Sequence, residues 1–269
     1  MIAVVDYQKG NLKSVERGLI AAGGEALITA DASEIAKADA IVLPGVGAFA
    51  DAAATMCELG QMEAIRERVR VGVPFLGICL GEHLMFEHGV EGAPEGSPAC
   101  GLGLLPGTVV AMPRYDAQGK AFKVPHVGWN TIEIPACGGS AAVPPCGEGG
   151  GNAVLSSGGA GGGAARSSAT KRGLFEHGAF PGSAPQVGSE LAFACPLFDG
   201  IAPGEYFYFT HSYIAPTGSH TIAETTHSTR FTSAVQFGEC AFGVQFHPEK
   251  SSDAGARVLA NFVAIAARG

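Results

Sequence analysis

Short apolar runs alternate with amphipathic stretches through the first 90 residues, and this alternation restricts the fold more than any other feature of the sequence. Uninterrupted apolar runs are typical of strands buried on both faces of a parallel sheet. Apolar residues spaced three and four apart are typical of helices that cover such a sheet. We expect strands near residues 2–6, 27–28, 40–43 and 73–78, and helices near residues 12–20, 48–57 and 61–70.

This βαβ series predicts an α/β fold with a doubly wound, mostly parallel sheet and helices on both faces. In such sheets, ligands bind at the carboxyl ends of the strands. The stretches at residues 104–112, 121–125 and 129–134 predict an additional antiparallel section, with residues 126–130 between two of its strands.

Cys79 ends one of the predicted strands and lies between Gly77 and Gly81. Glycines at these positions let a strand turn sharply into a helix and leave room for a substrate. A cysteine at such a turn is exposed at the sheet edge, beside helix N-terminal N–H groups that favour a thiolate. The alternative is a buried structural cysteine, which is the commonest environment of a free cysteine. This stretch alone leaves both interpretations open.

The distant segment His247-Pro248-Glu249 favours a nucleophile. Pro248 biases His247 towards an extended backbone, in which residues two apart lie on the same face. Glu249 can then orient the imidazole of His247, and the imidazole can act as a base towards a thiol. We interpret Cys79, His247 and Glu249 as a catalytic triad.

These motifs resemble those of class I glutamine amidotransferases and, more narrowly, of the glutaminase subunits of imidazole glycerol phosphate synthase. The narrower resemblance depends on motifs in family order at residues 6–7, 10–12, 43–49, 101–107, 123–130, 208–213 and 244–252. It implies a flavodoxin-like fold that hydrolyses L-glutamine to L-glutamate and ammonia without a metal or organic cofactor. The implied partner is a (β/α)8-barrel cyclase subunit of histidine biosynthesis, which receives the ammonia.

The resemblance also implies roles for particular residues. Backbone N–H groups of Leu80 and of Val46 or Gly47 would hold the oxyanion, after a partner-dependent reorientation of the loop peptide. A lone tryptophan is normally a core residue, but here the resemblance assigns Trp129 to the surface that faces the cyclase, together with Asn11 and Lys250. The residues expected to hold glutamine are Gly45, Gly47, His83, His211, Ser212 and Tyr213.

Two residues depart from the family pattern. His83 stands where class I amidotransferases carry a glutamine that helps to hold the substrate. Imidazole cannot offer the paired donor and acceptor of an amide, so glutamine binding is expected to weaken or change. A protonated His83 would also stabilise the thiolate of Cys79. Gln8 stands where a glycine is usual in the turn after Asp6 and Tyr7.

The composition limits the kinds of binding partner and the cellular compartment that we expect for this protein. The net charge of −8 argues against nucleic acid and anionic membranes as partners. The seven cysteines have no regular spacing, which indicates reduced thiols and neither a disulfide framework nor a zinc site. No apolar run is long enough to span a bilayer and no signal peptide is recognised, so we expect a cytoplasmic protein.

The stretch at residues 136–165 contains 11 glycines, no aromatic residue and a single charge. Such a composition buries too little apolar surface to offset the entropy lost on ordering. We therefore expect one amidotransferase domain over residues 1–269 that carries a disordered insertion at about 136–190. Beyond it, we expect a turn-flanked segment at residues 197–201, an aromatic strand at 205–213, a hairpin at 235–246 and a closing amphipathic helix at 254–267.

The sequence as a whole predicts a glutaminase in which Cys79 attacks the side-chain amide of glutamine and His247 transfers the protons. Two alternatives remain open at this stage. One is a glutaminase or γ-glutamyl hydrolase that serves another pathway. The other is a non-catalytic binding subunit in which His83 has weakened the use of glutamine.

Overall fold

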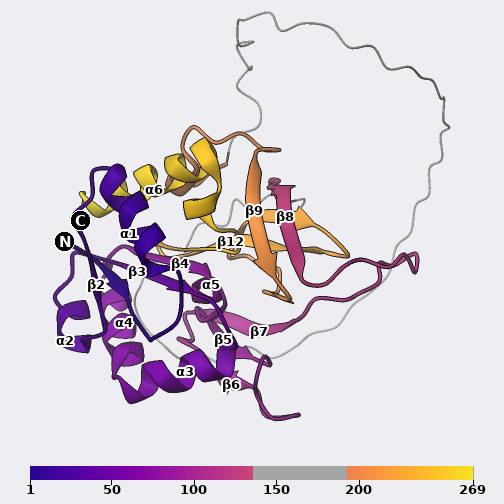
Figure 1. Cartoon of the computed structure of the whole chain (residues 1–269), viewed down its shortest axis with the longest axis horizontal. Helices are drawn as coiled ribbons and strands as arrows, with labels where there is room; N and C mark the ends of the chain where they lie inside the picture. Colours follow the sequence, from indigo (N-terminus) through magenta and orange to yellow (C-terminus); the bar gives the residue numbers. More distant parts are fainter. Residues whose placement is uncertain (136–192, 269) are drawn as a thin grey trace, which may run out of the picture. The chain divides into compact units, whose positions relative to one another are not determined.

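A seven-stranded sheet with the order β11-β12-β13-β4-β3-β1-β2 is the centre of the fold (Figure 1). This computed structural model describes residues 1–135 and 193–268, so the predicted insertion at 136–190 lies outside the described residues. The five neighbouring strands from β13 to β2 run parallel, whereas β12 pairs antiparallel with both β13 and β11. The strands are β1 (Ile2–Val5), β2 (Ala26–Thr29), β3 (Ala40–Gly45), β4 (Phe75–Cys79), β11 (Thr221–Thr226), β12 (Arg230–Phe237) and β13 (Ala241–Val244).

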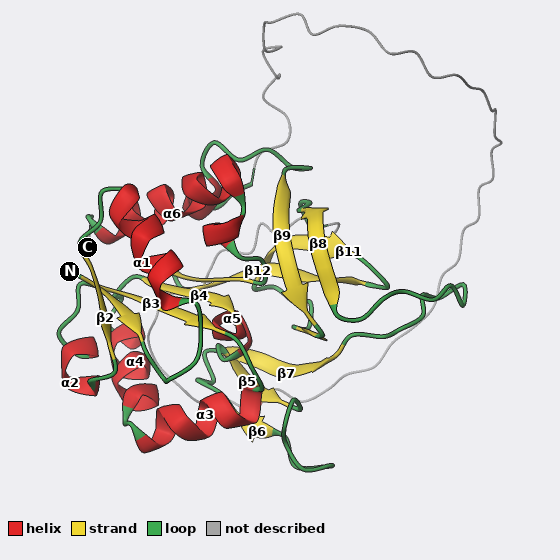
Figure 2. Ribbon diagram, viewed as in Figure 1, coloured by secondary structure: helices red, strands yellow, loops and turns green. Residues whose placement is uncertain are grey.

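Helices cover both faces of this sheet, which confirms the predicted doubly wound architecture (Figure 2). Alternate residues of a strand point to opposite faces, so Ile2 and Val4 pack in one core and Ala3 and Val5 in the other. The first core includes helices α1 (Leu12–Ala21) and α6 (Ser252–Ala266), and the second includes α2 (Ala32–Ile35), α3 (Phe49–Glu58) and α4 (Gln61–Arg70).

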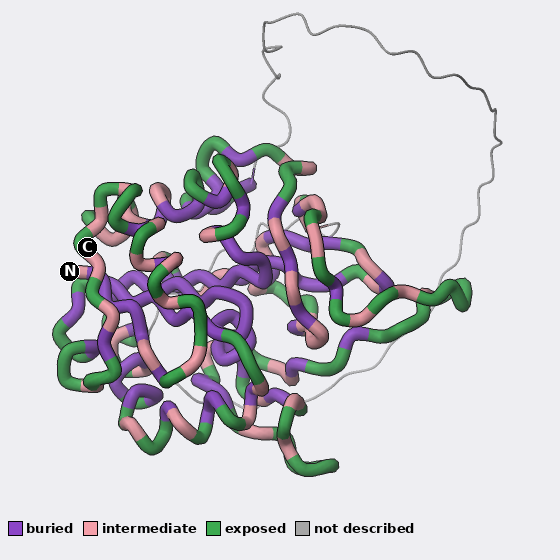
Figure 3. Tube along the Cα trace, in the orientation of Figure 1, coloured by how far each residue is buried: buried purple, intermediate pink, exposed green. Residues whose placement is uncertain are grey.

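The central strands β1, β3, β4 and β13 are buried along their whole length (Figure 3). The uninterrupted apolar runs of the sequence are therefore explained, because neither face of these strands meets solvent. Their carboxyl ends lie together, since Gly45 at the end of β3 pairs with Cys79 at the end of β4.

Two smaller sheets form the predicted antiparallel section. One has the order β10-β7-β5-β6 and the other pairs β8 with β9. The section is not wholly antiparallel, because β7 pairs antiparallel with β10 but parallel with β5. The strands are β5 (Phe86–Gly89), β6 (Ala99–Cys100), β7 (Leu105–Ala111), β8 (His126–Thr131), β9 (Tyr206–His211) and β10 (Tyr213–Ile214).

Two predictions for this section are wrong. Residues 121–125 form no strand, and residues 126–130, expected between strands, belong to β8 itself. Pro125 has no N–H to donate to a ladder, so pairing begins only after it. From His126 onwards the chain pairs with the aromatic strand β9, which leaves Val127 and Trp129 exposed and His126 buried.

Other differences concern the extent of the elements. The helix after Cys79 is a single turn, α5 (Leu80–His83), because the chain then turns into β5. Strand β11 was not predicted, since its Thr-Ile-Ala-Glu-Thr-Thr sequence lacks an apolar alternation. The segment expected at residues 197–201 contains the 3-10 helix η1 (Pro196–Phe198), and the final helix begins at Ser252.

We predict that Gly81→Ala destabilises the fold far more than Gly72→Ala. A Cβ at Gly81 would overlap the backbone carbonyl oxygen of Leu43, and neither backbone can move freely within the buried sheet. We expect a loss of more than about 3 kcal/mol in the free energy of unfolding, measured with urea. Gly72 has a φ of 86° and open space around it, so alanine there costs only about 1–2 kcal/mol. Equal losses would contradict this packing.

Candidate active site

The backbone at Cys79 forms a sharp, strained turn. Its φ of 55° and ψ of −106° lie outside the conformations that a non-glycine residue favours. Gly77 and Gly81 face each other across the turn, and a Cβ at Gly77 would lie 2.5 Å from the carbonyl oxygen of Gly81. The predicted need for two glycines is therefore confirmed, since they let β4 reverse into α5 at the sheet edge. The predicted exposure of Cys79 is wrong, because the residue is only 7% exposed.

His247 and Glu249 form a buried pair next to this turn. The distance from His247 Nδ1 to Glu249 Oε1 is 2.9 Å, and the two side chains are 4% and 2% exposed. The contact does not follow from an extended chain as predicted, because the 3-10 helix η2 (Pro248–Lys250) begins directly after His247. Glu249 folds back on His247 around that turn. The other ring nitrogen, Nε2, has no hydrogen-bond partner among the described residues.

The surroundings of His247 favour its protonated form. Burial alone would lower the pKa of His247, but interactions with Cys79 and Glu249 raise it to about 9. At neutral pH, the imidazole of His247 is therefore protonated, which suits it to donate a proton next to the Cys79 sulfur.

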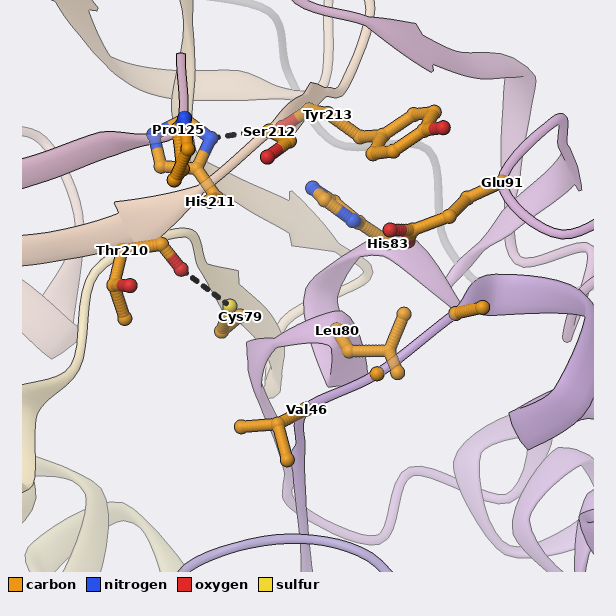
Figure 4. Close-up of a pocket in the computed structure, with 12 residues that line it drawn as sticks. Val46, Cys79, Leu80, His83, Glu91, Pro125, Thr210, His211, Ser212 and Tyr213 are labelled. Atoms are coloured by element: carbon orange, nitrogen blue, oxygen red, sulfur yellow. Dashed lines mark hydrogen bonds between the residues drawn. The ribbon is translucent and has the colours of Figure 1, made fainter. Parts of the chain in front are cut away.

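A cavity of about 390 Å³ opens above Cys79 (Figure 4). Its size suits a small ligand. Most of the predicted substrate and oxyanion residues line it, but Gly45 does not, and a Cβ at Gly45 would overlap the Tyr7 hydroxyl. The lining residues are Val46, Gly47, Ala48, Cys79, Leu80, His83, Glu91, Pro125, Thr210, His211, Ser212 and Tyr213.

The loop that carries Val46 and Gly47 lies over the Tyr7 hydroxyl. Burial and the charge of Cys79 raise the pKa of Tyr7, and the backbone N–H of Val46 acts in the opposite direction. Tyr7 Oη makes no hydrogen bond among the described residues. The predicted reorientation of this peptide towards an oxyanion stays a prediction.

His83 is held by a residue that the sequence analysis did not identify. His83 Nε2 lies 2.7 Å from Gln245 Oε1, and Gln245 Nε2 lies 3.7 Å from Cys79 Sγ. Burial lowers the pKa of His83 to about 4. The ring is therefore neutral at physiological pH, and the predicted stabilisation of the thiolate by a protonated His83 is wrong.

Two acidic residues near the cavity were also not identified as site residues. Glu91 lines the cavity beside His83 (Figure 4), and burial raises the pKa of its carboxyl, although the Phe49 N–H opposes this effect. Glu82 is fully buried with both carboxyl oxygens unpartnered among the described residues. Burial and the nearby Cys79 raise the pKa of Glu82 well above its ordinary value, so this side chain is a neutral acid.

A chain of hydrogen bonds holds His211 in the cavity wall. His211 Nδ1 donates to the Tyr213 carbonyl oxygen at 2.8 Å, so its Nε2 is left to accept from His126 Nδ1 at 3.1 Å. Asn130 Nδ2 in turn lies 3.3 Å from His126 Nε2. Burial is the main factor that lowers the pKa of His126 to about 4 and the pKa of His211 well below its ordinary value. Both rings are therefore neutral and rigidly oriented.

The three residues assigned to a partner surface are all exposed. Trp129 is 51% exposed, which excludes a core role, and its ring lies edge-on to Tyr208 with centroids 6.1 Å apart. Lys250 Nζ lies 5.9 Å above the same Tyr208 ring. Trp129 and Lys250 thus flank Tyr208, whereas Asn11 begins α1. Gln8 has a φ of 68°, which explains why a glycine is usual at this turn.

Within the described residues, no three His, Cys, Asp or Glu side chains are placed to hold a metal ion together. A search of the same residues finds no helix with the length and hydropathy that a membrane span requires.

Known proteins are similar to this chain in sequence and in fold. The family model described as "Glutamine amidotransferase class-I" matches residues 3–135 and 166–266. The imidazole glycerol phosphate synthase subunit HisH of Moorella thermoacetica is 37% identical, over 97% of this chain and 93% of that protein. The HisH subunit of Syntrophotalea carbinolica is 33% identical, over 97% and 98%. A crystal structure of a glutamine amidotransferase matches with a TM-score of 0.58 at 16% identity, over 99% of this chain and 98% of that one.

The chain therefore belongs to the class I glutamine amidotransferase family, a family of enzymes. Within that family it is similar along nearly its whole length to HisH subunits of imidazole glycerol phosphate synthase. The resemblance inferred from the sequence motifs is thus confirmed.

We predict that Glu249→Gln lowers thermal stability more at pH 6 than at pH 10. The pKa of His247 is raised from 6.5 to about 9 in the folded state. Its contribution to stability is therefore fully present below pH 6.5 and is lost as the pH rises through 9. Melting temperatures of the two proteins across this range test the prediction. The control, Glu239→Gln, alters an exposed carboxylate and should show no such trend. A difference in melting temperature between the two proteins that stays constant or widens towards pH 10 would contradict the prediction.

Proposed function

We propose that this protein hydrolyses L-glutamine to L-glutamate and ammonia, as the glutaminase subunit of an imidazole glycerol phosphate synthase in histidine biosynthesis. The observation that carries the proposal is the cavity at the strained Cys79, with the His247–Glu249 pair beside it. Similarity to HisH subunits supports the choice of pathway. A reaction of this kind would take place in the cytoplasm.

In the first half of the reaction, the Cys79 thiolate attacks the side-chain amide carbon of glutamine. A carbon–sulfur bond forms and the carbonyl oxygen becomes an oxyanion. The His247 imidazolium then donates its Nε2 proton to the amide nitrogen. The carbon–nitrogen bond breaks, ammonia leaves, and a thioester remains on Cys79.

In the second half, a water molecule attacks the thioester. Neutral His247 accepts a proton from this water, and a second oxyanion forms. When the carbon–sulfur bond breaks, glutamate leaves and Cys79 and His247 return to the thiolate–imidazolium pair. Glu249 holds the imidazole through Nδ1 during both halves and stabilises its charge.

The backbone would supply the oxyanion donors. The N–H of Leu80, directly after the nucleophile, provides one, and the N–H of Val46 or Gly47 provides the other. In this proposal the loop peptide turns before it donates. We propose that binding of the partner favours that turn, since Gly47, with a φ of 102°, makes a neighbouring backbone rotation easier.

The opposite wall of the cavity would hold the amino acid end of glutamine. The backbone of His211, Ser212 and Tyr213 is fixed by the histidine chain and is expected to bind the α-carboxylate. The His83 ring lies between this segment and Glu91, and the ring and the Glu91 carboxyl suit the α-ammonium. The Phe49 N–H gives Glu91 a second, structural role at the start of α3.

The surface formed by Asn11, Trp129 and Lys250 would face the (β/α)8-barrel cyclase subunit. Exposed aromatic side chains with a neighbouring cation are typical anchors of protein interfaces. Lys250 directly follows Glu249 in η2, so a partner bound at Lys250 would act close to the triad. Ammonia released in the cavity would then pass to the cyclase.

We predict that glutamate release from L-glutamine is strong only with a ligand-bound cyclase subunit. Cys79→Ala and His247→Asn should each lower kcat by at least about 10³-fold, because triad members act as a unit. Cys57→Ala, which removes an exposed cysteine, is the matched control and should leave kcat unchanged. Turnover is measured by glutamate formation with and without the partner.

Two outcomes of this assay would contradict the proposal. High turnover without any partner would favour a glutaminase or γ-glutamyl hydrolase of another pathway. No turnover with a cyclase subunit that binds would favour a non-catalytic subunit.

A further inference from the structure

Gln245 is a fully buried side chain that lies between two residues of the cavity. It follows β13 directly, and its backbone N–H donates to the Ser233 carbonyl oxygen at 3.0 Å, so its position is fixed by the sheet. Its amide nitrogen lies 3.7 Å from Cys79 Sγ, and its amide oxygen lies 2.7 Å from His83 Nε2. One amide group therefore connects the nucleophile to His83.

The chemistry of an amide determines which atom donates in each of these two contacts. The NH2 group can only donate, and the carbonyl oxygen can only accept. The amide nitrogen therefore donates to the Cys79 sulfur, and the amide oxygen accepts the hydrogen that the neutral His83 ring carries on Nε2. The reversed amide would place a second carbonyl oxygen against the Cys79 sulfur, which already lies 3.9 Å from the Thr210 carbonyl oxygen. A neutral imidazole carries one proton, so His83 Nδ1 is left as an acceptor.

The hydrogen bond to Gln245 uses His83 Nε2, and no hydrogen bond to His83 Nδ1 is found among the residues that the structure describes. The ring lines the cavity between Glu91 and the segment of Ser212 and Tyr213 (Figure 4). Burial keeps the ring neutral, since it lowers the pKa of His83 to about 4. His83 Nδ1 is thus a hydrogen-bond acceptor that faces the cavity.

We propose that Gln245 is a positioning residue that holds His83 in the Nε2–H tautomer, so that Nδ1 accepts a hydrogen bond from the α-ammonium group of the substrate. The same amide steadies the Cys79 sulfur. This proposal rests on the proposed function. His83 would thus provide the hydrogen-bond acceptor that the amide oxygen of the usual glutamine provides. This acceptor explains how the site selects substrates with an α-amino group.

The tautomer of His83 is tested first, on the isolated wild-type chain. Nitrogen-15 NMR of labelled histidine distinguishes the two tautomers, and His83→Gln identifies the His83 signals by their loss. We expect the Nε2–H form in the wild type and a mixture in Gln245→Met, which keeps the volume of the side chain but not its hydrogen bonds. A wild-type ring in the Nδ1–H form would overturn the proposal. This measurement needs neither turnover nor a partner.

Substrate selection is tested next, in the complex with the cyclase subunit. The readout is the ratio of kcat/KM for L-glutamine to that for glutaramate, which lacks the α-amino group. We expect Gln245→Met and His83→Leu to lower this ratio about tenfold, the effect of one hydrogen bond to a charged group. His83→Gln should keep the ratio, because its amide oxygen is also an acceptor.

The control for substrate selection is Gln236→Met, which removes an amide that donates to the Gly238 carbonyl oxygen away from the cavity. It should leave the ratio unchanged. An unchanged ratio in Gln245→Met, with normal glutamine turnover, would overturn the inference while the proposed function stands. Absence of glutamine turnover in the wild-type complex would instead overturn the proposed function.

Discussion

The reversal of the chain at Cys79 is the constraint on which the other features of the site depend. A non-glycine residue at a φ of 55° and ψ of −106° costs of the order of 1–3 kcal/mol. Strand β4 can hold this conformation because it is buried along its length and paired with β3 on one side and β13 on the other. The stable sheet thus maintains a strained residue at its edge, where the sulfur meets the cavity.

The same sheet brings the remaining parts of the site to this sulfur. Strand β3 ends in the loop of Val46 and Gly47, and β13 leads through Gln245 to His247. The Thr210 carbonyl oxygen, from β9, lies 3.9 Å from Cys79 Sγ. The segments after β3 and β13 converge on Cys79 because these strands flank β4 and their ends meet at one edge, while β9 reaches the sulfur from the two-stranded sheet.

Burial then determines which of the side chains around Cys79 carry charge. Desolvation keeps His83, His126 and His211 neutral and Glu82 protonated. His247 is the exception, because Glu249 and Cys79 more than offset its burial. A single imidazolium beside the Cys79 sulfur, with neutral histidines around it, gives proton transfer a defined donor.

Much of the fold and the sharp turn at Cys79 could be predicted, because local sequence patterns indicate these features. The apolar runs at residues 40–43 and 73–78 locate buried strands, and the glycines around Cys79 locate the turn. Gln245 and Glu91 could not be found in this way. Their roles arise from contacts with residues far away in the sequence, and nothing in their neighbouring residues distinguishes them.

The partial successes are instructive for the same reason. His247 and Glu249 do meet, but around η2 rather than along a strand, so the spacing predicted the contact and not its geometry. His83 does line the cavity, yet its charge depends on burial that the sequence does not reveal. The strand β8 was misjudged because its stability comes from pairing with β9 rather than from its own residues.

The central claim is that Cys79 attacks a glutamine side chain held in the cavity. The most direct measurement is covalent labelling of the chain, in complex with a cyclase subunit, by a glutamine analogue with an electrophilic carbon, such as 6-diazo-5-oxo-L-norleucine. Peptide mass spectrometry then locates the adduct among the cysteines. We predict one adduct, on Cys79, whose formation is slowed by L-glutamine. Labelling of the exposed Cys57 and Cys100 at a similar rate, without protection by L-glutamine, would contradict the account.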